Sequence, residues 1–388
     1  MKQTLTVSAY LALKEIWRSR WRFLLVSLVI ALITLLVLFI AALGEGLGNG
    51  NREYLSKLDG ELLVYQAKSD FLIAASRLST DRVVEVRRVA GVADAGMLGT
   101  ASATLLLEGD ETLKAALLGV EPGRVGEPPV VNGRQLAGEE VDEVIIDRNT
   151  AIRTGLAVGD ALTLRVTQGA EDAFFTLQIV GLTDGRQYSL QPAIFVPFLT
   201  WDRVRPQSAA ELNFADATAN VIIVRLVDPN AVETMQPTLA AQVEKVDVAT
   251  LQEAIQALPG YSAQQSTLNT QGGFTLFIGI LVIGGFFQIQ ILQKVSQIGV
   301  LKAIGTANAI VAWASVIQII VITVVGVAIG ALLTFMFSLF FPPTVPIVFN
   351  GTTSAIAVIA LLLIGPAGGL VSIRYAVRIE PLKALGLN

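Results

Sequence analysis

The side chains that usually carry catalysis and metal binding are scarce in this chain of 388 residues. It contains no cysteine and no histidine, so disulfides, thiolate metal sites and a histidine general base are excluded. No G-x-S-x-G sequence is present for a nucleophilic serine. The G-x-x-x-x-G-K-[ST] phosphate loop is also missing, so the chain is not expected to bind ATP in that way. We therefore expect a non-catalytic protein that itself binds no cofactor and no metal.

Carboxylates are the main remaining candidates for chemistry. An acidic run holds Glu139, Glu140, Asp142 and Glu143; it could bind a cation but is more typical of a solvated surface. Glu45 lies among glycines directly after an apolar run, where a carboxylate is unusual. It is either an interfacial carboxylate that reaches water or part of a site where a substrate enters between helices.

Long apolar segments explain a composition that is 53% hydrophobic and only 15% charged. A helix needs about 20 apolar residues to cross a bilayer, which predicts transmembrane helices at 23–43, 269–294, 309–341 and 352–373. The first of these is too long for the apolar part of a signal peptide and lacks a convincing cleavage site, so we interpret it as a retained anchor. The glycine-rich residues 44–50 are interpreted as a flexible exit from it.

The distribution of charge predicts the orientation in the membrane. Basic residues dominate next to the spans, whereas residues 45–268 are acidic. Because basic residues flank a membrane on its cytoplasmic side, we expect both termini, including the tail 374–388, in the cytoplasm of a bacterial cell, with the large domain outside the plasma membrane. Within residues 1–22, residues 4–18 alternate apolar and polar residues at roughly helical spacing, and a basic cluster follows them. This pattern predicts a helix in the cytoplasmic interface or, alternatively, an extension of the first span.

The fold class predicted is a membrane α-helical protein with an α+β extracytoplasmic domain, residues 44–268, inserted between its first two transmembrane helices. Strands are predicted at 143–147, 161–166, 174–181 and 220–226, and helices at 81–89, 149–155, 231–243 and 251–258. Thr250 and Glu253 have the spacing of a capping box at the start of the last helix.

Residues 290–305, QILQKVSQIGVLKAIG, closely resemble a signature of the MacB/FtsX family of ABC-transporter permeases. Residues 12–22 (ALKEIWRSRWR), 145–164 (IIDRNTAIRTGLAVGDALTL) and 374–385 (RYAVRIEPLKAL) are also similar to this family. One span, an outer domain and three further spans follow in the family's order, so the resemblance covers essentially the whole chain. Within the family, residues 11–47 look most like the heme-exporter branch called HrtB, and a related branch, DevC, exports glycolipids.

The resemblance implies that residues 295–308 form a cytoplasmic segment that couples the permease to a separate ATPase subunit, which would bind ATP and magnesium. The candidate contact residues are Lys294, Gln297, Lys302, Thr306 and Asn308. The family also implies a homodimer or a pseudo-twofold pair surrounded by membrane lipid. An extracytoplasmic adaptor is a further candidate partner, and no nucleic acid is expected.

Heme as a substrate would need a ligand other than histidine, and Glu45, Tyr54 and Met97 are the candidates for this role at a substrate access site. Gly326 and Gly330 form a small-x-x-x-small face that permits close helix contact, either between subunits or within one.

The leading functional hypothesis is an exporter of a hydrophobic or amphipathic small molecule, with heme or a lipid favoured, driven by mechanotransmission from the ATPase. The alternatives are an FtsX-like regulator whose outer domain activates a cell-wall hydrolase, and a permease that releases lipoproteins.

Overall fold

The computed structural model describes residues 2–107, 109, 111–208, 217–341, 345 and 347–378. The chain forms two compact units. The helical unit contains Met1–Gly46 and Gln265–Asn388, and the strand-rich unit contains Leu47–Gln264. The division falls inside two long helices, α2 (Arg20–Ser56) and α8 (Tyr261–Gln293).

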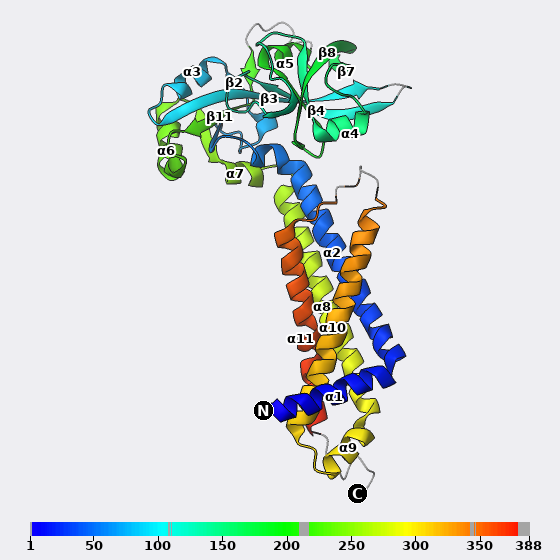
Figure 1. Cartoon of the computed structure of the whole chain (residues 1–388). Coiled ribbons are helices and arrows are strands. Elements are labelled where there is room, and N and C mark those ends of the chain that lie inside the picture. Colours follow the sequence, from blue (N-terminus) through cyan, green and yellow to red (C-terminus); the bar gives the residue numbers. More distant parts are fainter. Residues whose placement is uncertain are drawn as a thin grey trace. The chain divides into compact units, whose positions relative to one another are not determined.

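A bundle of apolar helices forms the helical unit. It consists of α2 and α8 together with α10 (Asn308–Ser338) and α11 (Gly351–Arg378), which lie side by side (Figure 1). Within the part of the chain that the structure describes, these four helices are long and apolar enough to cross a membrane. A helix satisfies its backbone hydrogen bonds internally, which is the requirement for a segment in hydrocarbon.

Two glycines of α10 allow that helix to contact α2 at backbone distance. A Cβ atom added to Gly326 would lie 2.6 Å from Cβ of Ile30, and one added to Gly330 would lie 2.5 Å from the carbonyl oxygen of Ala31. Both glycines are buried within this one chain. The small-x-x-x-small face is therefore used for packing inside the subunit, which is the second of the two alternatives that its sequence left open.

The glycines of α11 likewise allow close helix contacts, one with α10 and one with α8. A Cβ atom at Gly365 would overlap Oγ1 of Thr323 on α10, at 2.0 Å. A Cβ atom at Gly368 would lie 2.7 Å from the carbonyl oxygen of Ile280 on α8. Side chains larger than hydrogen cannot occupy these positions without separating the helices.

The glycine-rich segment 44–50 is helical, and the prediction of a flexible exit is wrong. α2 continues without a break to Ser56. The reason lies in packing, which overrides the weak helix propensity of glycine. A Cβ atom at Gly44 would lie 3.1 Å from Cδ1 of Leu268, and one at Gly50 would lie 2.9 Å from Cδ2 of Leu190.

The N-terminal residues form a separate helix, α1 (Lys2–Arg18), which lies across one end of the bundle and is joined to α2 by a turn at Ser19 (Figure 1). The hydroxyl of Ser8 donates a hydrogen bond to the carbonyl oxygen of Ile310 at 3.2 Å. Tyr10 and Trp17 of α1 are exposed. Exposed aromatic side chains of this kind suit a helix that lies in a membrane interface. α1 is therefore not a continuous extension of the first span.

A mixed sheet organises the strand-rich unit. Among the described residues it has ten strands, and its main path runs β12-β1-β11-β3-β4-β9-β6-β8-β5, with β7 paired to β3 and β8. A separate pair consists of β2 and β10. The strands are β1 (Leu62–Gln66), β2 (Leu78–Ser79), β3 (Val92–Leu106), β4 (Thr112–Val120), β5 (Val130–Gly133), β6 (Glu143–Asp147), β7 (Ala161–Gln168), β8 (Glu171–Thr183), β9 (Ala193–Pro197), β10 (Thr218–Ala219), β11 (Val221–Leu226) and β12 (Val246–Thr250).

Apolar side chains cover both faces of this sheet. On β1, Leu62 and Val64 belong to one core cluster, whereas Leu63 and Tyr65 belong to another. Successive side chains of a strand point to opposite faces, so a strand buried on both sides is a continuous apolar run. The helices of this unit are α3 (Asp81–Arg87), α4 (Arg148–Thr154), α5 (Phe198–Val204), α6 (Val232–Gln242) and α7 (Leu251–Gln256).

Several local predictions for this unit are confirmed. β6 has the predicted bounds, and α4 ends at Thr154, followed by Gly155, whose φ of 73° suits a residue without a side chain. Thr250 and Glu253 form the predicted capping box at the start of α7.

Trp201 of α5 packs flat on two glycines of neighbouring strands, and this contact generates a stability prediction. A Cβ atom at Gly99 of β3 would lie 2.4 Å from Cδ2 of the indole. We predict that Gly99→Ala lowers the free energy of unfolding of this unit by about 1–3 kcal/mol, the usual cost of overpacking a core. Thermal unfolding followed by tryptophan fluorescence measures the effect. Gly138→Ala is the matched control, because its Cβ would meet only Val141, at 3.8 Å. Equal melting temperatures for the two variants would contradict the proposed contact.

Candidate functional site

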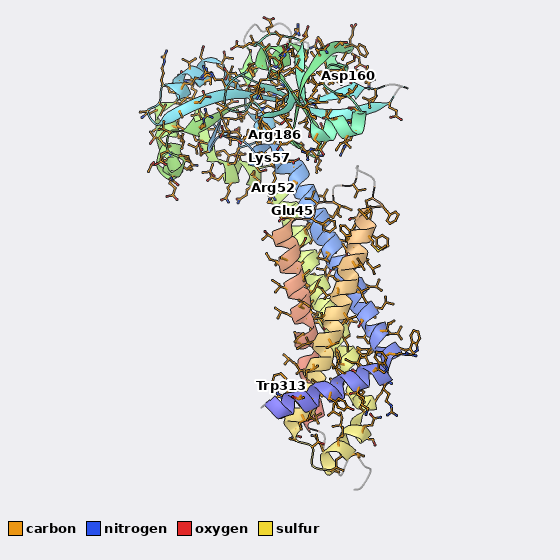
Figure 2. All side chains as sticks on the ribbon, in the orientation of Figure 1. Glu45, Arg52, Lys57, Asp160, Arg186 and Trp313 are labelled. Atoms are coloured by element: carbon orange, nitrogen blue, oxygen red, sulfur yellow. The ribbon has the colours of Figure 1, made fainter. Side chains whose placement is uncertain are left out.

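Glu45 lies on α2 near one end of the helical bundle (Figure 2). Its side chain is half-buried. The amide nitrogen of Asn350 donates a hydrogen bond to Oε1 at 3.3 Å, and the hydroxyl of Thr353 donates to Oε2 at 3.4 Å. The carbonyl oxygen of the Asn350 side chain accepts a hydrogen bond from the backbone N–H of Thr352 at 3.0 Å. The start of α11 therefore holds the carboxylate in place.

A cavity of about 330 Å³ opens beside this carboxylate, and we call it the rim cavity. α2, α8 and α11 all contribute to its walls. Polar side chains are few: Glu45, Gln265, Asn269 and Thr353. The remaining lining residues are apolar or glycine: Val37, Ile40, Ala41, Gly44, Leu268, Gly272, Gly273, Leu276, Ile356, Ala357 and Ala360.

Two glycines of α8, which have no side chains, help to create this cavity. A Cβ atom added to Gly272 or to Gly273 would meet no other atom within 4 Å. At Gly44, by contrast, the added atom would lie against Leu268, so α2 and α8 are in contact there. The two helices thus touch at one glycine and leave space beside two others.

The chemistry that this arrangement offers is recognition by apolar contact plus one anionic group. Ligand sites are usually mostly apolar with a small number of placed polar groups. Within the lining of the rim cavity, Glu45 is the charged residue. Its carboxylate can accept hydrogen bonds, pair with a cation or offer oxygen to a metal centre of a bound molecule. Neither a nucleophile–base pair nor a proton relay is present in this lining.

Tyr54 and Met97, which the sequence offered as companions of Glu45, do not line the rim cavity. Tyr54 is fully buried in the strand-rich unit, and its hydroxyl donates to the carbonyl oxygen of Gly126 at 3.1 Å. Met97 is 9% exposed and packs in the core cluster on the other face of the sheet. Both side chains pack in the cores of the strand-rich unit, so Glu45 is the one of the three that lines the rim cavity.

Lys294, at the far end of α8, has partners inside the subunit. Its ammonium group pairs with Glu15 of α1, and the amide of Gln318 on α10 donates to the same carboxylate. Only 13% of the Lys294 side chain is exposed. Lys294 thus lies inside the subunit, where its ion pair with Glu15 holds α1 against the bundle. Its role as an ATPase contact stays a prediction.

The segment predicted to couple to an ATPase contains a short helix, α9 (Val295–Ala303), then residues 304–307, after which α10 begins at Asn308. Gln297 and Asn308 are exposed, and Thr306 is half-buried. Nζ of Lys302 donates to the carbonyl oxygen of Val377 at 2.7 Å, and burial lowers the pKa of this lysine. Gln297 and Asn308 are therefore the predicted residues with side chains most open to a partner.

Two apolar residues at this end were missed from the sequence. Val300 is 46% exposed and Ile304, just after α9, is 75% exposed. They are four positions apart, so they lie on the same side of a helical turn. The sequence contained a signal for Ile304, because an isoleucine in a loop between two membrane spans cannot be explained by contact with lipid. An exposed apolar pair of this kind suits a protein contact.

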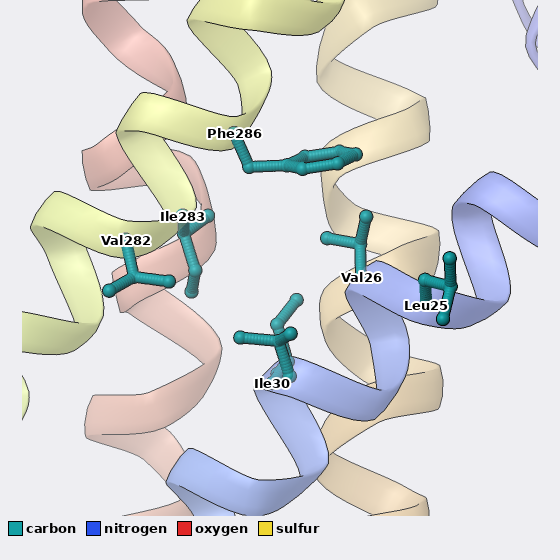
Figure 3. Close-up of a pocket in the computed structure, with 7 residues that line it drawn as sticks. Leu25, Val26, Ile30, Val282, Ile283 and Phe286 are labelled. Carbon is teal, nitrogen blue, oxygen red and sulfur yellow. The ribbon is translucent and has the colours of Figure 1, made fainter.

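A second hollow, of about 160 Å³, lies between α2 and α8 (Figure 3). Val26 and Ile30 of α2 face Val282, Ile283 and Phe286 of α8 across it. The lining contains no polar side chain. It offers no directional recognition, and we do not assign a substrate to it.

The acidic run has structural partners. Asp142 pairs with Arg203, and Oε1 of Glu143 lies 2.5 Å from Nη2 of Arg134. The hydrogen bond from Arg134 holds the pKa of Glu143 below its ordinary value. No group of three or more potential metal ligands occurs among the residues that the structure describes.

Two family descriptions match the chain over adjoining ranges. Residues 23–257 match the MacB-like periplasmic core domain, and residues 270–381 match the FtsX-like permease C-terminal domain. The first match covers most of α2 and nearly all of the strand-rich unit, and the second covers most of α8 together with α9, α10 and α11.

Similar proteins have the same extent as this chain. One from Staphylococcus epidermidis that carries the name hemin transport system permease protein HrtB is 25% identical, with 97% of this chain and 99% of that protein aligned. An uncharacterized ABC transporter permease of Mycobacterium tuberculosis, Rv2563, is also 25% identical over 97% of this chain and 99% of its own length. Among solved structures, the periplasmic region of MacB from Actinobacillus actinomycetemcomitans aligns with a TM-score of 0.37 at 12% identity, covering 53% of this chain and 94% of that one.

Proposed function

This chain belongs to the MacB/FtsX family of ABC-transporter permeases, and we propose that it is the membrane subunit of an exporter for a hydrophobic or amphipathic small molecule. The observation that carries this proposal is the rim cavity, in which a half-buried carboxylate faces apolar walls built from three membrane helices. A molecule dissolved in the bilayer can reach such a site sideways, without crossing the cytosol.

A separate subunit supplies the energy in this proposal. The chain has no phosphate-binding loop, and its family consists of permeases that work with ABC ATPases, which hold ATP and magnesium. The ATPase contacts α9 and the following turn on the cytoplasmic side. The basic residues next to the spans support cytoplasmic termini and an extracytoplasmic strand-rich unit. We further propose a homodimer in lipid, with an extracytoplasmic adaptor as an additional partner.

Mechanotransmission is the proposed mode of action. ATP-driven closure of the ATPase subunits moves α9, and α8 and α10 on either side of it transmit that movement through the bilayer. α8 also supplies Gly272 and Gly273 to the rim cavity, so displacement of this helix changes the size of the cavity. The strand-rich unit moves with α2 and α8 in this proposal, because the chain enters it from α2 and leaves it into α8.

Heme and lipids are the favoured substrates. A relative that shares 25% of its residues over nearly the whole length carries a name for hemin transport. The carboxylate of Glu45 can supply an oxygen ligand to ferric iron in a chain without histidine, and the apolar walls suit a macrocycle or an acyl chain. An entirely apolar cavity would not distinguish such molecules from bulk lipid, whereas this carboxylate does.

Replacement of the carboxylate tests the proposal. We predict that Glu45→Gln, which keeps the shape but removes the charge, raises the hemin concentration needed for half-maximal stimulation of ATP hydrolysis by about tenfold, equivalent to about 1.4 kcal/mol of binding. The measurement uses the chain reconstituted with its ATPase in lipid vesicles. Glu139→Gln, at an exposed carboxylate of the acidic run, is the matched control. Wild-type stimulation in Glu45→Gln, or no response to hemin in the wild type, would contradict heme as the substrate.

The exposed apolar pair gives a second prediction. Ile304→Ser removes an apolar side chain that the ATPase would bury. We therefore expect the affinity of the ATPase for the chain to fall about tenfold. Co-purification from detergent at varied concentrations measures this change. Ile152→Ser, at an isoleucine of α4 that is 60% exposed, is the control. The contact is wrong if both variants retain the ATPase equally well.

A further inference from the structure

The strand-rich unit contains a cavity of its own, with a volume of about 370 Å³, which we call the sheet cavity. It lies where β3 passes the segment 71–75, the turn 188–191 and the residues that follow α7. Its volume falls in the range of small-molecule sites, about 300–1,000 Å³. The proposed exporter function makes no use of it.

The walls of the sheet cavity divide by chemistry. Phe71, Leu72 and Leu258 form an apolar side, whereas Ser102 and Gln191 contribute polar groups. No side chain in the lining carries a charge. A charged ligand would lose its hydration here without gaining a partner, so the cavity favours a neutral molecule with an apolar part and hydrogen-bonding oxygens.

The polar groups are held in defined positions. The hydroxyl of Ser102 donates to Oε1 of Gln191 at 3.1 Å. Tyr188 is half-buried, and desolvation of its hydroxyl raises its pKa to about 12, so its phenol is neutral at physiological pH. Asn220 accepts a hydrogen bond from the backbone N–H of Thr100 at 2.7 Å and donates to the carbonyl oxygen of Ile73 at 3.0 Å. This one amide therefore fixes two walls of the cavity relative to each other.

Residues with unfavourable backbone conformations border the cavity. Ser189 and Leu190 have φ angles of 53° and 62° at the centre of a tight turn between Tyr188 and Gln191. Positive φ at both central positions normally selects asparagine and glycine. Phe71, which also lines the cavity, has a positive φ of 57°. Strained residues of this kind persist where the surrounding structure enforces them, and they cluster at ligand sites.

An unpaired hydroxyl lies behind the apolar wall. Tyr65 is fully buried, and its hydroxyl has no hydrogen-bond partner among the described residues. Its ring meets the ring of Phe71 edge-on, with 5.5 Å between centroids. A buried hydroxyl without a partner is costly, so a ligand oxygen that reaches past Phe71 would gain a hydrogen bond that the protein does not supply.

We propose that the sheet cavity binds a neutral amphipathic small molecule. Its apolar part packs on Phe71, Leu72 and Leu258, and its oxygens bond to Ser102 and Gln191. The uncharged lining selects against anions and cations of the same size. This site is independent of the rim cavity, and its test requires neither the ATPase nor hemin.

The absence of cysteine from the chain allows a site-specific reporter. Ala75→Cys places one thiol at an exposed position in the cavity lining, where it is labelled with the polarity-sensitive fluorophore bimane in the full chain in lipid nanodiscs. Hexyl β-glucoside, a neutral probe, is titrated below its micelle concentration. We expect a saturable blue shift, with at least tenfold weaker responses to hexanoate and to hexylammonium. Thr176→Cys, exposed on β8 outside the cavity, should give no saturable shift.

A second pair of variants tests the polar wall in the Ala75→Cys background. Gln191→Leu removes the amide and should weaken the response to hexyl β-glucoside about tenfold, whereas Gln252→Leu, at an exposed glutamine of α7, should leave it unchanged. The proposal is overturned by a response that does not saturate, by equal responses at both reporter positions, by equal responses to the charged probes, or by equal effects of the two glutamine variants.

Discussion

Backbone contact at glycine holds the membrane helices together. Apolar side chains gain little by moving from lipid to a helix interface, so association in a bilayer relies on close van der Waals packing at small residues. Gly326 and Gly330 bring α10 onto α2, and Gly365 brings α11 onto α10. Large side chains such as Leu332 and Leu363 remain on the outside, where lipid solvates them. The absence of such a contact explains the rim cavity, because no atom of another helix packs against Gly272 or Gly273.

α8 connects the two ends of the proposed mechanism. Gly272 lines the rim cavity, and Lys294, directly after the helix, pairs with Glu15 of α1. At 1.5 Å per residue, the helical path between these positions is roughly 33 Å, close to the thickness of the hydrocarbon core. In the proposed mechanism, a continuous helix of this length carries a displacement from residues 295–308 to the cavity. The ion pair between Lys294 and Glu15 joins α1 to this end of α8, a contact that the sequence did not predict.

The sequence predicted the features that depend on local pattern. Uninterrupted apolar runs located the membrane helices, and the capping box of Thr250 and Glu253 located α7. β3 was missed because VADAGMLGTASATLL is rich in alanine and glycine, which have low strand propensity; pairing with β4 and β11 decides its conformation.

The features around the candidate site that the sequence did not predict also depend on tertiary packing. The helix through Gly44–Gly50 depends on neighbours that are distant in sequence, such as Leu268. The burial of Tyr54 and Met97 in the cores of the sheet likewise depends on which residues the fold brings to each face. Glu45 could be selected from sequence because a carboxylate beside an apolar run is unusual wherever the chain folds.

Blocking the rim cavity chemically is the most direct test of substrate access through it. Gly272→Cys introduces the only thiol of the chain into the cavity wall, and a bulky maleimide attached there fills the open space beside α8. Gly285→Cys is the matched control, since Gly285 is an exposed glycine of the same helix with equally open surroundings. In vesicles that contain the chain and its ATPase, we predict that labelling at position 272 reduces ATP-driven hemin export at least tenfold, while labelling at position 285 leaves it unchanged. Undiminished export after complete labelling at 272, or an equal loss at both positions, would contradict it.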